Sequence, residues 1–352
     1  MQKKETGNEH VQRAEFRKDL VSGDWILIAN TARGKRPELL KQKVAESKDD
    51  KSKCPFEDPQ KSGNPIPLLW FPSPDTPPAE WEDFNSWFVQ VIPNKYPLLY
   101  HEGKCPDIEE KEGRLTLGAV GYHEVIITRD HEKTLADMSI EEIVLVLKAY
   151  KERYRVLAKD PCMKFILIFH NHGEAAGASL AHPHSQLVGM PIIDPDVSSS
   201  LKGSAEFFKE NKKCVHCVMI EQEMKDGERV LRKNDHFITV VPFAPRVSYE
   251  TRIYPLEHAS RFEDLDKDLF IPLAEALKDA LTRLNKALGN PDYNFFIHTS
   301  PVGKEGDYGH YHWHIEILPR GFKWAGLELG SGVEVVAVSP EIAADHLKEV
   351  LQ

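Results

Sequence analysis

Cysteine is scarce in this chain of 352 residues. The sequence holds five cysteines, an odd number that is low for a chain of this length. Small secreted scaffolds that depend on disulfides carry many more for their size. We therefore expect thiols or metal ligands rather than a framework of disulfides.

Long hydrophobic runs are also missing. No apolar stretch approaches the roughly 20 residues that cross a bilayer. The opening residues, MQKKETGNEHVQRAEF, have no apolar segment of the kind found in signal peptides. These two absences predict a cytoplasmic protein without a membrane partner.

The sequence has no excess of positive charge. Its 45 Lys and Arg residues are outnumbered by 55 Asp and Glu residues, which gives a formal net charge of −10. This balance argues against nonspecific binding to nucleic acid, although it leaves room for a local positive pocket. The composition, with 41% hydrophobic and 28% charged residues, is that of an ordinary soluble globular protein.

The length favours two units, and an internal repeat supports them. YHEVIITRDHEKTLADMSIEEIVLVL and YETRIYPLEHASRFEDLDKDLFIPL both contain a predicted strand, a histidine and an amphipathic helix. KFILIFHNHG matches YNFFIHTSP, and HPHSQLVGMP matches HWHIEILPR. The aligned histidines are His131 with His258 at an offset of 127, and His182 with His312 and His184 with His314 at an offset of 130. These matches in the same order predict two copies of one α+β unit.

Local patterns give the elements of each copy. Runs rich in β-branched and aromatic residues, such as EVIITR and FILIF, predict strands. Ser139 with Glu142 three residues later is the pattern of a capping box and predicts the start of a helix. The proline-rich stretch KSKCPFEDPQKSGNPIPLLWFPSPDTPP is expected to be a long irregular excursion, held by a metal or used for binding.

The segment HNHGEAAGASLAHPHSQ, residues 170–186, concentrates the polar chemistry. If AHPHSQLV is a strand, its period of two places His182, His184 and Gln186 on one face. Gly173 and Gly177 in the preceding loop allow backbone N–H groups to approach an anion. The combination suggests a phosphate beside a neutral imidazole that acts as a nucleophile. The alternative is a set of hydrogen-bonded surface histidines on an edge strand, where Pro183 is tolerated.

The second copy differs in both its strand and its loop. His312 and His314 are kept, but Glu316 stands where the first copy has Gln186. The loop HTSPVGKEGDYGHY lacks the alanine-rich approach. Only the first copy is therefore expected to receive phosphate, which leaves the histidines of the second copy freer to bind metal.

These residues carry a resemblance to a known family. GASLAHPHSQ, with ARGKRP, KCPF, NKYP and the duplication, closely resembles the galactose-1-phosphate uridylyltransferase family of the histidine-triad superfamily. The resemblance covers residues from about 14 to about 340. It implies an α+β fold of tandem histidine-triad-like domains, each an antiparallel sheet packed with helices. The expected domains are residues 14–195, with the nucleophile, and residues 196–352, with a second metal site.

The resemblance also implies a double-displacement reaction. A histidine would attack the α-phosphorus of UDP-glucose and release glucose 1-phosphate, after which galactose 1-phosphate would take the uridylyl group. The implied partners are UDP-glucose or UDP-galactose and hexose 1-phosphates, with no nucleic acid and no membrane. Whether the protein forms a homodimer stays open.

Residue roles follow from the matching motifs of the family. His184 would be the nucleophile, and Gln186 would hydrogen-bond the transferred phosphoryl group. Ser179 and the Gly177 backbone would hold the phosphates of the nucleotide. Further substrate-binding positions implied by the resemblance are Asn171 on the phosphate side, Arg36 and Asn94 along the nucleotide, and Glu328 in FKWAGLELG, where Lys323 lies one place off the family pattern.

Two metal sites are implied. The first corresponds to Cys54, Glu57, His123 and His182, with Glu57 where the family has cysteine; zinc accepts a carboxylate, but an empty site stays open. The second site contains the CVHC motif. Together with the resemblance to plant ADP-glucose phosphorylases, this motif implies the ligands Cys214, Cys217, His258 and His312. His298 and His314 are reserve ligands, because other family members bind iron there. We expect one or two zinc ions, with iron as the alternative at the second site.

Three functions remain in view. The leading one is a UDP-glucose–hexose-1-phosphate uridylyltransferase. The second is an ADP-glucose or dinucleoside-polyphosphate phosphorylase that uses the same histidine and takes inorganic phosphate as acceptor; the Cys214–Cys217 pair favours this group. The third is a non-catalytic nucleotide-binding protein, against which the presence of both His184 and Gln186 argues.

Overall fold

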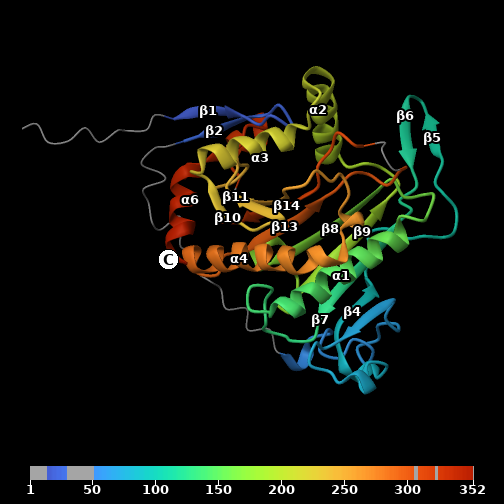
Figure 1. The fold of residues 1–352 in the computed structure, drawn as a ribbon. Coiled ribbons are helices and arrows are strands. Elements are labelled where there is room, and N and C mark those ends of the chain that lie inside the picture. Colours follow the sequence, from blue (N-terminus) through green and yellow to red (C-terminus); the bar gives the residue numbers. More distant parts are fainter. Residues whose placement is uncertain (1–13, 30–50, 305–307, 322–323, 352) are drawn as a thin grey trace, which may run out of the picture.

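A computed structural model describes residues 14–29, 51–304, 308–321 and 324–351 (Figure 1). Its centre is one ten-stranded sheet in which every neighbouring pair is antiparallel. In spatial order the strands are β10 (Val230–Lys233), β11 (Phe237–Val240), β12 (Thr251–Pro255), β14 (His314–Pro319), β13 (Tyr293–His298), β8 (Phe165–His172), β9 (His184–Met190), β7 (Tyr122–Thr128), β4 (Trp87–Pro93) and β3 (Leu69–Pro72).

The strand order is symmetric about the junction between β8 and β13. Outward from the junction, β9, β7, β4 and β3 on one side correspond to β14, β12, β11 and β10 on the other. Register supports the same correspondence, since Val125 lies opposite Gln186 in the first copy and Arg252 lies opposite Glu316 in the second. The predicted α+β class is confirmed, and the two copies share one sheet instead of forming two separate ones.

Two long helices cover one face of the sheet. They are α1 (Ile140–Leu157) and α4 (Phe270–Leu288), which lie next to each other in Figure 1. The largest buried cluster joins Leu147 of α1 and Leu281 of α4 to sheet residues such as Ile168 and Phe295. Helix α1 begins with the predicted capping box of Ser139 and Glu142. The largest apolar cluster therefore lies on this face, whereas the other face combines smaller apolar clusters with polar side chains.

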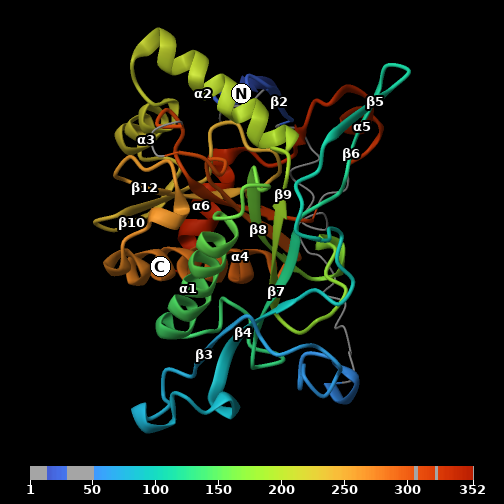
Figure 2. The same ribbon diagram turned by 90° about the vertical axis from the view of Figure 1, so that its right-hand side faces the viewer.

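Shorter elements lie around the sheet. The shorter helices are α2 (Pro195–Asn211), α3 (Val215–Asp226), α5 (Gly326–Ser331) and α6 (Pro340–Glu349). The 3₁₀ turns are η2 (Lys51–Lys53), η3 (Pro78–Glu80), η4 (Phe84–Ser86), η5 (Glu174–Ala176), η6 (Phe262–Asp264) and η7 (Lys267–Leu269). Figure 2 shows α1 on one side of β7, β8 and β9, and α5 with the hairpin of β5 (Ile108–Lys111) and β6 (Arg114–Leu117) on the other. Within the described ranges, no helix has the length and apolar character to cross a bilayer.

The first described strands pair with the end of the chain. β1 (Glu15–Lys18) pairs with β2 (Trp25–Ile28), which pairs in parallel with β15 (Val335–Val336). Arg17 also forms an ion pair with Glu341 of α6 at 2.8 Å. A division at residue 195 stays our proposal for the two units, and these strands would then cross from the first unit to cover the second.

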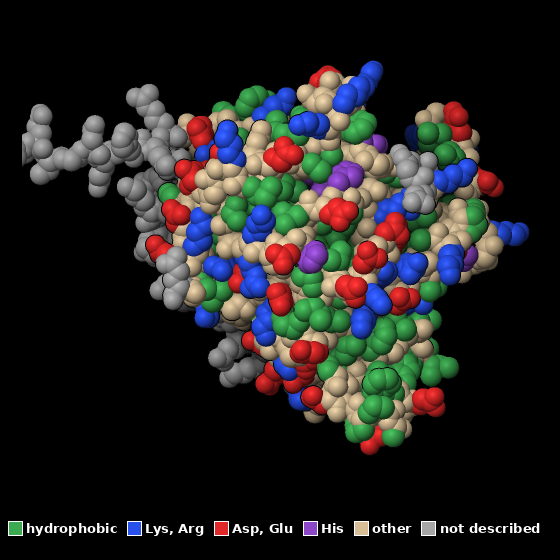
Figure 3. Space-filling model, viewed as in Figure 1, with side chains coloured by type: hydrophobic (Ala, Val, Ile, Leu, Met, Phe, Trp, Pro, Cys, Tyr) green, Lys and Arg blue, Asp and Glu red, His purple; other side chains and the backbone are tan. Residues whose placement is uncertain are grey.

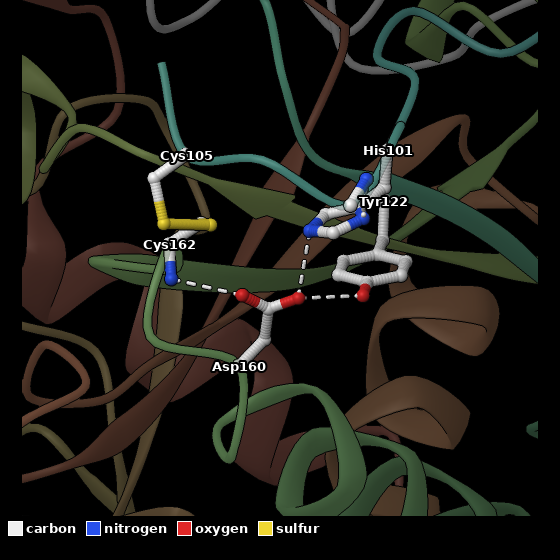
Figure 4. The surroundings of a disulfide bond; sticks show 6 residues. His101, Cys105, Tyr122, Asp160 and Cys162 are labelled. Atoms are coloured by element: carbon white, nitrogen blue, oxygen red, sulfur yellow. Dashed lines mark hydrogen bonds and ion pairs between the residues drawn. A yellow bond between two sulfur atoms is a disulfide. The ribbon is translucent and has the colours of Figure 1, made fainter. Parts of the chain in front are cut away.

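Two cysteines that we expected as thiols or metal ligands form a disulfide. Cys105 and Cys162, 57 residues apart in sequence, are joined between the loop before β5 and the loop after α1 (Figure 4). Beside them, Asp160 accepts hydrogen bonds from the Tyr122 hydroxyl at 2.7 Å and the Cys162 N–H at 2.8 Å. The expectation was wrong here because the sheet brings together segments whose proximity no local pattern reveals. Cys54, Cys214 and Cys217 form no disulfide.

Reduction of this disulfide should lower stability. A bond that closes a loop with a sequence separation of 57 residues restricts the unfolded chain, and we expect its loss to cost about 4 kcal/mol of unfolding free energy. Denaturant titration with and without a dithiol reductant measures the difference. The Cys105→Ser variant is the control and should not respond to reductant; equal stability of the oxidised and reduced wild type would contradict the expectation.

Candidate functional site

Strand β9 presents its polar residues on the face opposite the helices. His184 and Gln186 point to that open face, while Leu187 enters the apolar core. Ser185, on the core side, hydrogen-bonds the Tyr150 hydroxyl of α1. The alternation predicted from the period of two is confirmed for these residues. Because β9 lies between β7 and β8, the alternative of an edge strand does not hold.

The surroundings of His184 leave one ring nitrogen available. Its Nδ1 lies 2.8 Å from the carbonyl oxygen of His182, which can only accept, so Nδ1 carries the proton. The ring is 7% exposed, and the Phe56 ring lies against it at 5.2 Å between centroids. Burial lowers the pKa of His184. The imidazole is therefore neutral at neutral pH, with a lone pair on Nε2.

The loop before His184 is fixed by a residue of the second copy. The Ala175 N–H donates to Asp292 Oδ2 at 2.6 Å, and a side chain at Gly173, where φ is +83°, would overlap the Asp292 carboxylate. Gly177 has φ of +85°, and its N–H donates to the Glu174 carbonyl at 2.9 Å. The N–H of Gly177, a residue whose backbone is expected to hold phosphate, is thus already used within the η5 turn.

Asn171 and Ser179 flank this loop. Asn171 Oδ1 accepts from Asn294 Nδ2 at 2.8 Å, and Asn294 also donates to the Ala176 carbonyl at 2.8 Å. With its oxygen occupied, Asn171 has its amide nitrogen left as a donor on the open face. Ser179 is exposed between the loop and His182. Both residues offer the donors that an anionic phosphate requires.

The remaining expected substrate residues are spread more widely. Asn94, directly after β4, lies 3.1 Å from His123 through its amide nitrogen. Glu328 is half-buried in α5, where its Oε2 accepts from the Ala325 N–H at 2.9 Å. Arg36 and Lys323 lie outside the described residues. The structure therefore brings Asn94 toward the His184 strand, whereas the contacts of Glu328 are within its own helix.

The first cluster of metal-ligand side chains contains Cys54, Glu57, His131 and His182. His182 Nε2 lies 2.7 Å from the Thr128 carbonyl, so its proton is on Nε2 and its Nδ1 lone pair faces the cluster. His182 Nδ1 lies 3.2 Å from His131 Nδ1 and 3.6 Å from Cys54 Sγ. Glu57 Oε1, 2.7 Å from His131 Nδ1, is buried and accepts no hydrogen bond. Acceptor atoms that converge in this way fit a tetrahedral cation.

His123, which we expected in this cluster, is replaced by His131. His123 lies near the start of β7 opposite Val188, whereas His182 contacts Thr128 at the end of the same strand. Thr128 lies five positions after His123 along the strand, a span of roughly 17 Å. The repeat contained the missed signal, because His131 aligns with His258, a ligand expected for the second site.

The second cluster contains the four expected residues Cys214, Cys217, His258 and His312. His312 Nε2 lies 3.0 Å from the Pro255 carbonyl and His258 Nε2 2.9 Å from that of Gly309. Both Nδ1 atoms therefore face Cys217 Sγ, at 3.5 Å and 3.4 Å. A hydrogen bond from Cys217 lowers the pKa of Cys214 and raises that of Cys217. Two sulfur and two Nδ1 donors fit zinc.

A third group of possible metal ligands includes His314, the residue of the second copy that corresponds to His184. His298, His314 and Glu316 lie at a cavity of about 250 Å³ in the second copy. Their surroundings differ from those of the first copy, because Arg252 and Arg246 lie 3.6 Å and 3.8 Å from Glu316. These two cations compete with any metal ion for the carboxylate.

The exposed charge is mixed on the face seen in Figure 3, where Lys and Arg side chains alternate with Asp and Glu side chains. This distribution agrees with the acidic net charge of −10.

The fold and site define a duplicated α+β protein in which one of two equivalent histidine strands faces a glycine-bounded loop. Residues 4–193 match the family model described as galactose-1-phosphate uridyl transferase, N-terminal domain. The ADP-glucose phosphorylase of Arabidopsis thaliana is 34% identical over 343 residues, with 96% of this chain and 93% of that protein covered. The chain belongs to the galactose-1-phosphate uridylyltransferase family.

Other relatives agree with this membership. The galactose-1-phosphate uridylyltransferase of Thermotoga maritima is 30% identical over 264 residues, which are 73% of this chain and 82% of that protein. The crystal structure of the Arabidopsis thaliana ADP-glucose phosphorylase with bound ADP-glucose aligns with a TM-score of 0.78 and 34% identity, covering 96% of this chain and 99% of that one. A uridylyltransferase structure aligns with a TM-score of 0.70 and 28% identity, covering 96% and 98%.

Substitutions should separate the two metal clusters. Cys54→Ser and Cys217→Ser should each remove about one bound metal ion per chain if both clusters are filled, because each removes one of four ligands. The Cys217→Ser variant should also melt at a lower temperature, since its cluster joins three distant stretches of chain. Elemental analysis and thermal unfolding measure both effects.

A matched pair tests the reassignment in the first cluster. His131→Ala should lower the metal content as Cys54→Ser does, whereas His123→Ala should leave it unchanged. The reverse result would restore His123 as the ligand. An unchanged metal content in all of these variants would contradict metal binding by the first cluster.

Proposed function

We propose that this protein transfers a nucleotidyl group from a nucleoside diphosphate glucose to a phosphate acceptor through a covalent nucleotidyl-His184 intermediate. The observation that carries the proposal is the state of His184, a buried neutral imidazole whose Nδ1 proton is held by the His182 carbonyl. Its Nε2 lone pair faces the open side of the sheet beside the loop of residues 173–179. Such a nitrogen is an activated nucleophile that needs no further base.

The bond between His184 Nε2 and phosphorus forms in the first chemical step and breaks in the second. Nε2 of His184 attacks the α-phosphorus, the bond to the bridging oxygen breaks, and glucose 1-phosphate leaves with the electron pair. A phosphate oxygen of the acceptor then attacks the same phosphorus and breaks its bond to Nε2. The ring is cationic in the intermediate, and the hydrogen bond from Nδ1 to the His182 carbonyl stabilises that charge.

Donor groups around the loop would hold the phosphates. The Asn171 amide, the Ser179 hydroxyl and the Gln186 amide are the groups we assign to this role, and none of them carries a charge that would repel the nucleotide. Asn94 would lie along the nucleotide. The first metal cluster contributes indirectly, since zinc held there would fix the backbone of His182, whose carbonyl orients the nucleophile.

UDP-glucose with galactose 1-phosphate as acceptor is the leading substrate pair. A second candidate is ADP-glucose with inorganic phosphate. It is favoured by 34% identity to the Arabidopsis thaliana ADP-glucose phosphorylase over 96% of this chain, and by the Cys214–Cys217 cluster. Both candidates use the same first step, so the donor and the acceptor distinguish them and the nucleophile does not.

Mass spectrometry of the intact protein tests the intermediate. After incubation with UDP-glucose or ADP-glucose, wild type should gain a uridylyl or adenylyl group, and His184→Asn should gain neither while keeping its fold and its nucleotide binding. His314→Asn is the matched control, because His314 also donates Nδ1–H to a carbonyl, that of His312 at 3.1 Å, but lacks the loop. Adduct on His184→Asn, or its loss from a well-folded His314→Asn, would overturn the assignment.

Steady-state kinetics should follow a ping-pong pattern. The first sugar phosphate leaves before the acceptor binds. Double-reciprocal plots of initial rate against nucleotide-sugar concentration, taken at several acceptor concentrations, should therefore give parallel lines. Label should also exchange between the nucleotide sugar and glucose 1-phosphate without acceptor. Intersecting lines and no exchange would contradict the intermediate, and rates with galactose 1-phosphate and with inorganic phosphate would identify the acceptor.

A further inference from the structure

The amide of Gln186 has two ends with opposite hydrogen-bonding character. Its NH₂ group donates and suits an anionic phosphoryl oxygen, whereas its carbonyl oxygen would repel one. A side chain that rotates freely would present either end to the open face. The residue that fixes this orientation is His123, which lies on the same face two positions from Val125, the direct neighbour of Gln186 across the strands.

A backbone group sets the tautomer of His123. The N–H of Leu98 donates to His123 Nδ1 at 3.1 Å, so Nδ1 has a lone pair and the proton of the neutral ring is on Nε2. His123 Nε2 lies 2.8 Å from Gln186 Oε1. The Nε2–H group of His123 can form a hydrogen bond only with the carbonyl oxygen of Gln186, because the NH₂ group of Gln186 is itself a donor. The NH₂ group of Gln186 is thereby left to face the open side of the sheet.

Asn94 also contacts Nε2 of His123. Its Oδ1 accepts from the Tyr96 N–H at 2.9 Å, which places its amide nitrogen 3.1 Å from His123 Nε2. Two groups that both carry protons cannot share a hydrogen bond, so the Nε2 proton is directed to Gln186 and the hydrogens of Asn94 turn elsewhere. His123 is buried, with 7% of its surface exposed, and solvent does not offer a competing acceptor.

The second copy lacks this pair. The positions equivalent to His123 and Gln186, at the repeat offsets of 127 and 130, are Glu250 and Glu316. Glu250 accepts from Arg252 Nε at 2.6 Å, and the same nitrogen lies 3.6 Å from Glu316. Two carboxylates have no N–H to offer a phosphate. The histidine–glutamine pair therefore occurs only in the copy that has the candidate nucleophile and its loop.

We propose that His123 is a positioning residue, which acts by holding the Gln186 carbonyl so that the Gln186 NH₂ group meets the transferred phosphoryl group. The proposal rests on the nucleotidyl transfer proposed above. His123 touches neither the phosphorus nor the nucleophile in this scheme. Its effect is on the rate of phosphoryl transfer and not on the affinity for the nucleotide.

Two conservative substitutions distinguish a donor at Nε2 from a general need for a polar side chain. The amide nitrogen of His123→Gln reaches the place of Nε2, whereas that of His123→Asn reaches only the place of Nδ1. In single-turnover formation of the His184 adduct, His123→Gln should stay within about threefold of wild type. His123→Asn and Gln186→Ala should each be slower by on the order of 10- to 100-fold, with unchanged nucleotide affinity.

The double variant His123→Asn/Gln186→Ala provides the decisive comparison. If His123 acts through Gln186, the double variant should be no slower than Gln186→Ala alone, because the glutamine that His123 orients is gone. Additive losses would overturn the proposal, and so would a His123→Gln variant as slow as His123→Asn. A lower nucleotide affinity for His123→Asn would assign the residue to binding instead.

A readout without turnover separates this proposal from the function on which it rests. In ¹⁵N-histidine-labelled protein, His123 should carry its proton on Nε2, and its resonance should move in Gln186→Ala. His101 is the internal control, since Gly103 N–H donates to its Nδ1 at 3.1 Å and its Nε2 lies 2.8 Å from Asp160, and its resonance should stay. If wild type formed no adduct, the proposed function would fail on its own, and a proton on Nδ1 of His123 would still overturn the orientation.

Discussion

The pairing of β8 with β13 is the contact on which the rest of the structure depends. It joins the two copies into one sheet and places Asn171 directly opposite Asn294. Through this junction the second copy supplies Asn294 and Asp292, which fix the loop beside His184. The second copy thus contributes contacts to the candidate site of the first, and the chemistry proposed for His184 would use both copies.

A second constraint recurs in three histidines, which are His184, His182 and His123. One ring nitrogen is committed to the backbone, and the other is thereby given a defined character. Carbonyl groups hold Nδ1 of His184 and Nε2 of His182, whereas an N–H group holds Nδ1 of His123. The same ring is therefore suited to the proposed role of nucleophile, metal ligand or donor, according to which backbone group it meets.

The sequence was informative where the signal is periodic or repeated. It predicted the α+β class, the capping box at Ser139 and the open face of β9, all of which depend on neighbours within a few residues. The family match predicted His123 in the first metal cluster, whereas the fold brings His131 to Cys54, Glu57 and His182, in agreement with the internal repeat that pairs His131 with His258. The contact of Asp292 with the loop and the Cys105–Cys162 bond could not be predicted from the sequence, since both depend on segments that only the folded sheet brings together.

The symmetry of the central junction has a consequence for how the two copies have diverged. Phe169 lies opposite Phe296, and Ile168 lies opposite Ile297, so residues of the same type pair where the two copies meet, in an antiparallel arrangement like that across the twofold axis of a homodimer. The molecule is in this sense a dimer made in one chain, and the linkage removes the requirement that both partners stay identical. The second copy carries Glu316 in buried ion pairs where the first copy has Gln186, while its β13 edge pairs with β8 along the junction.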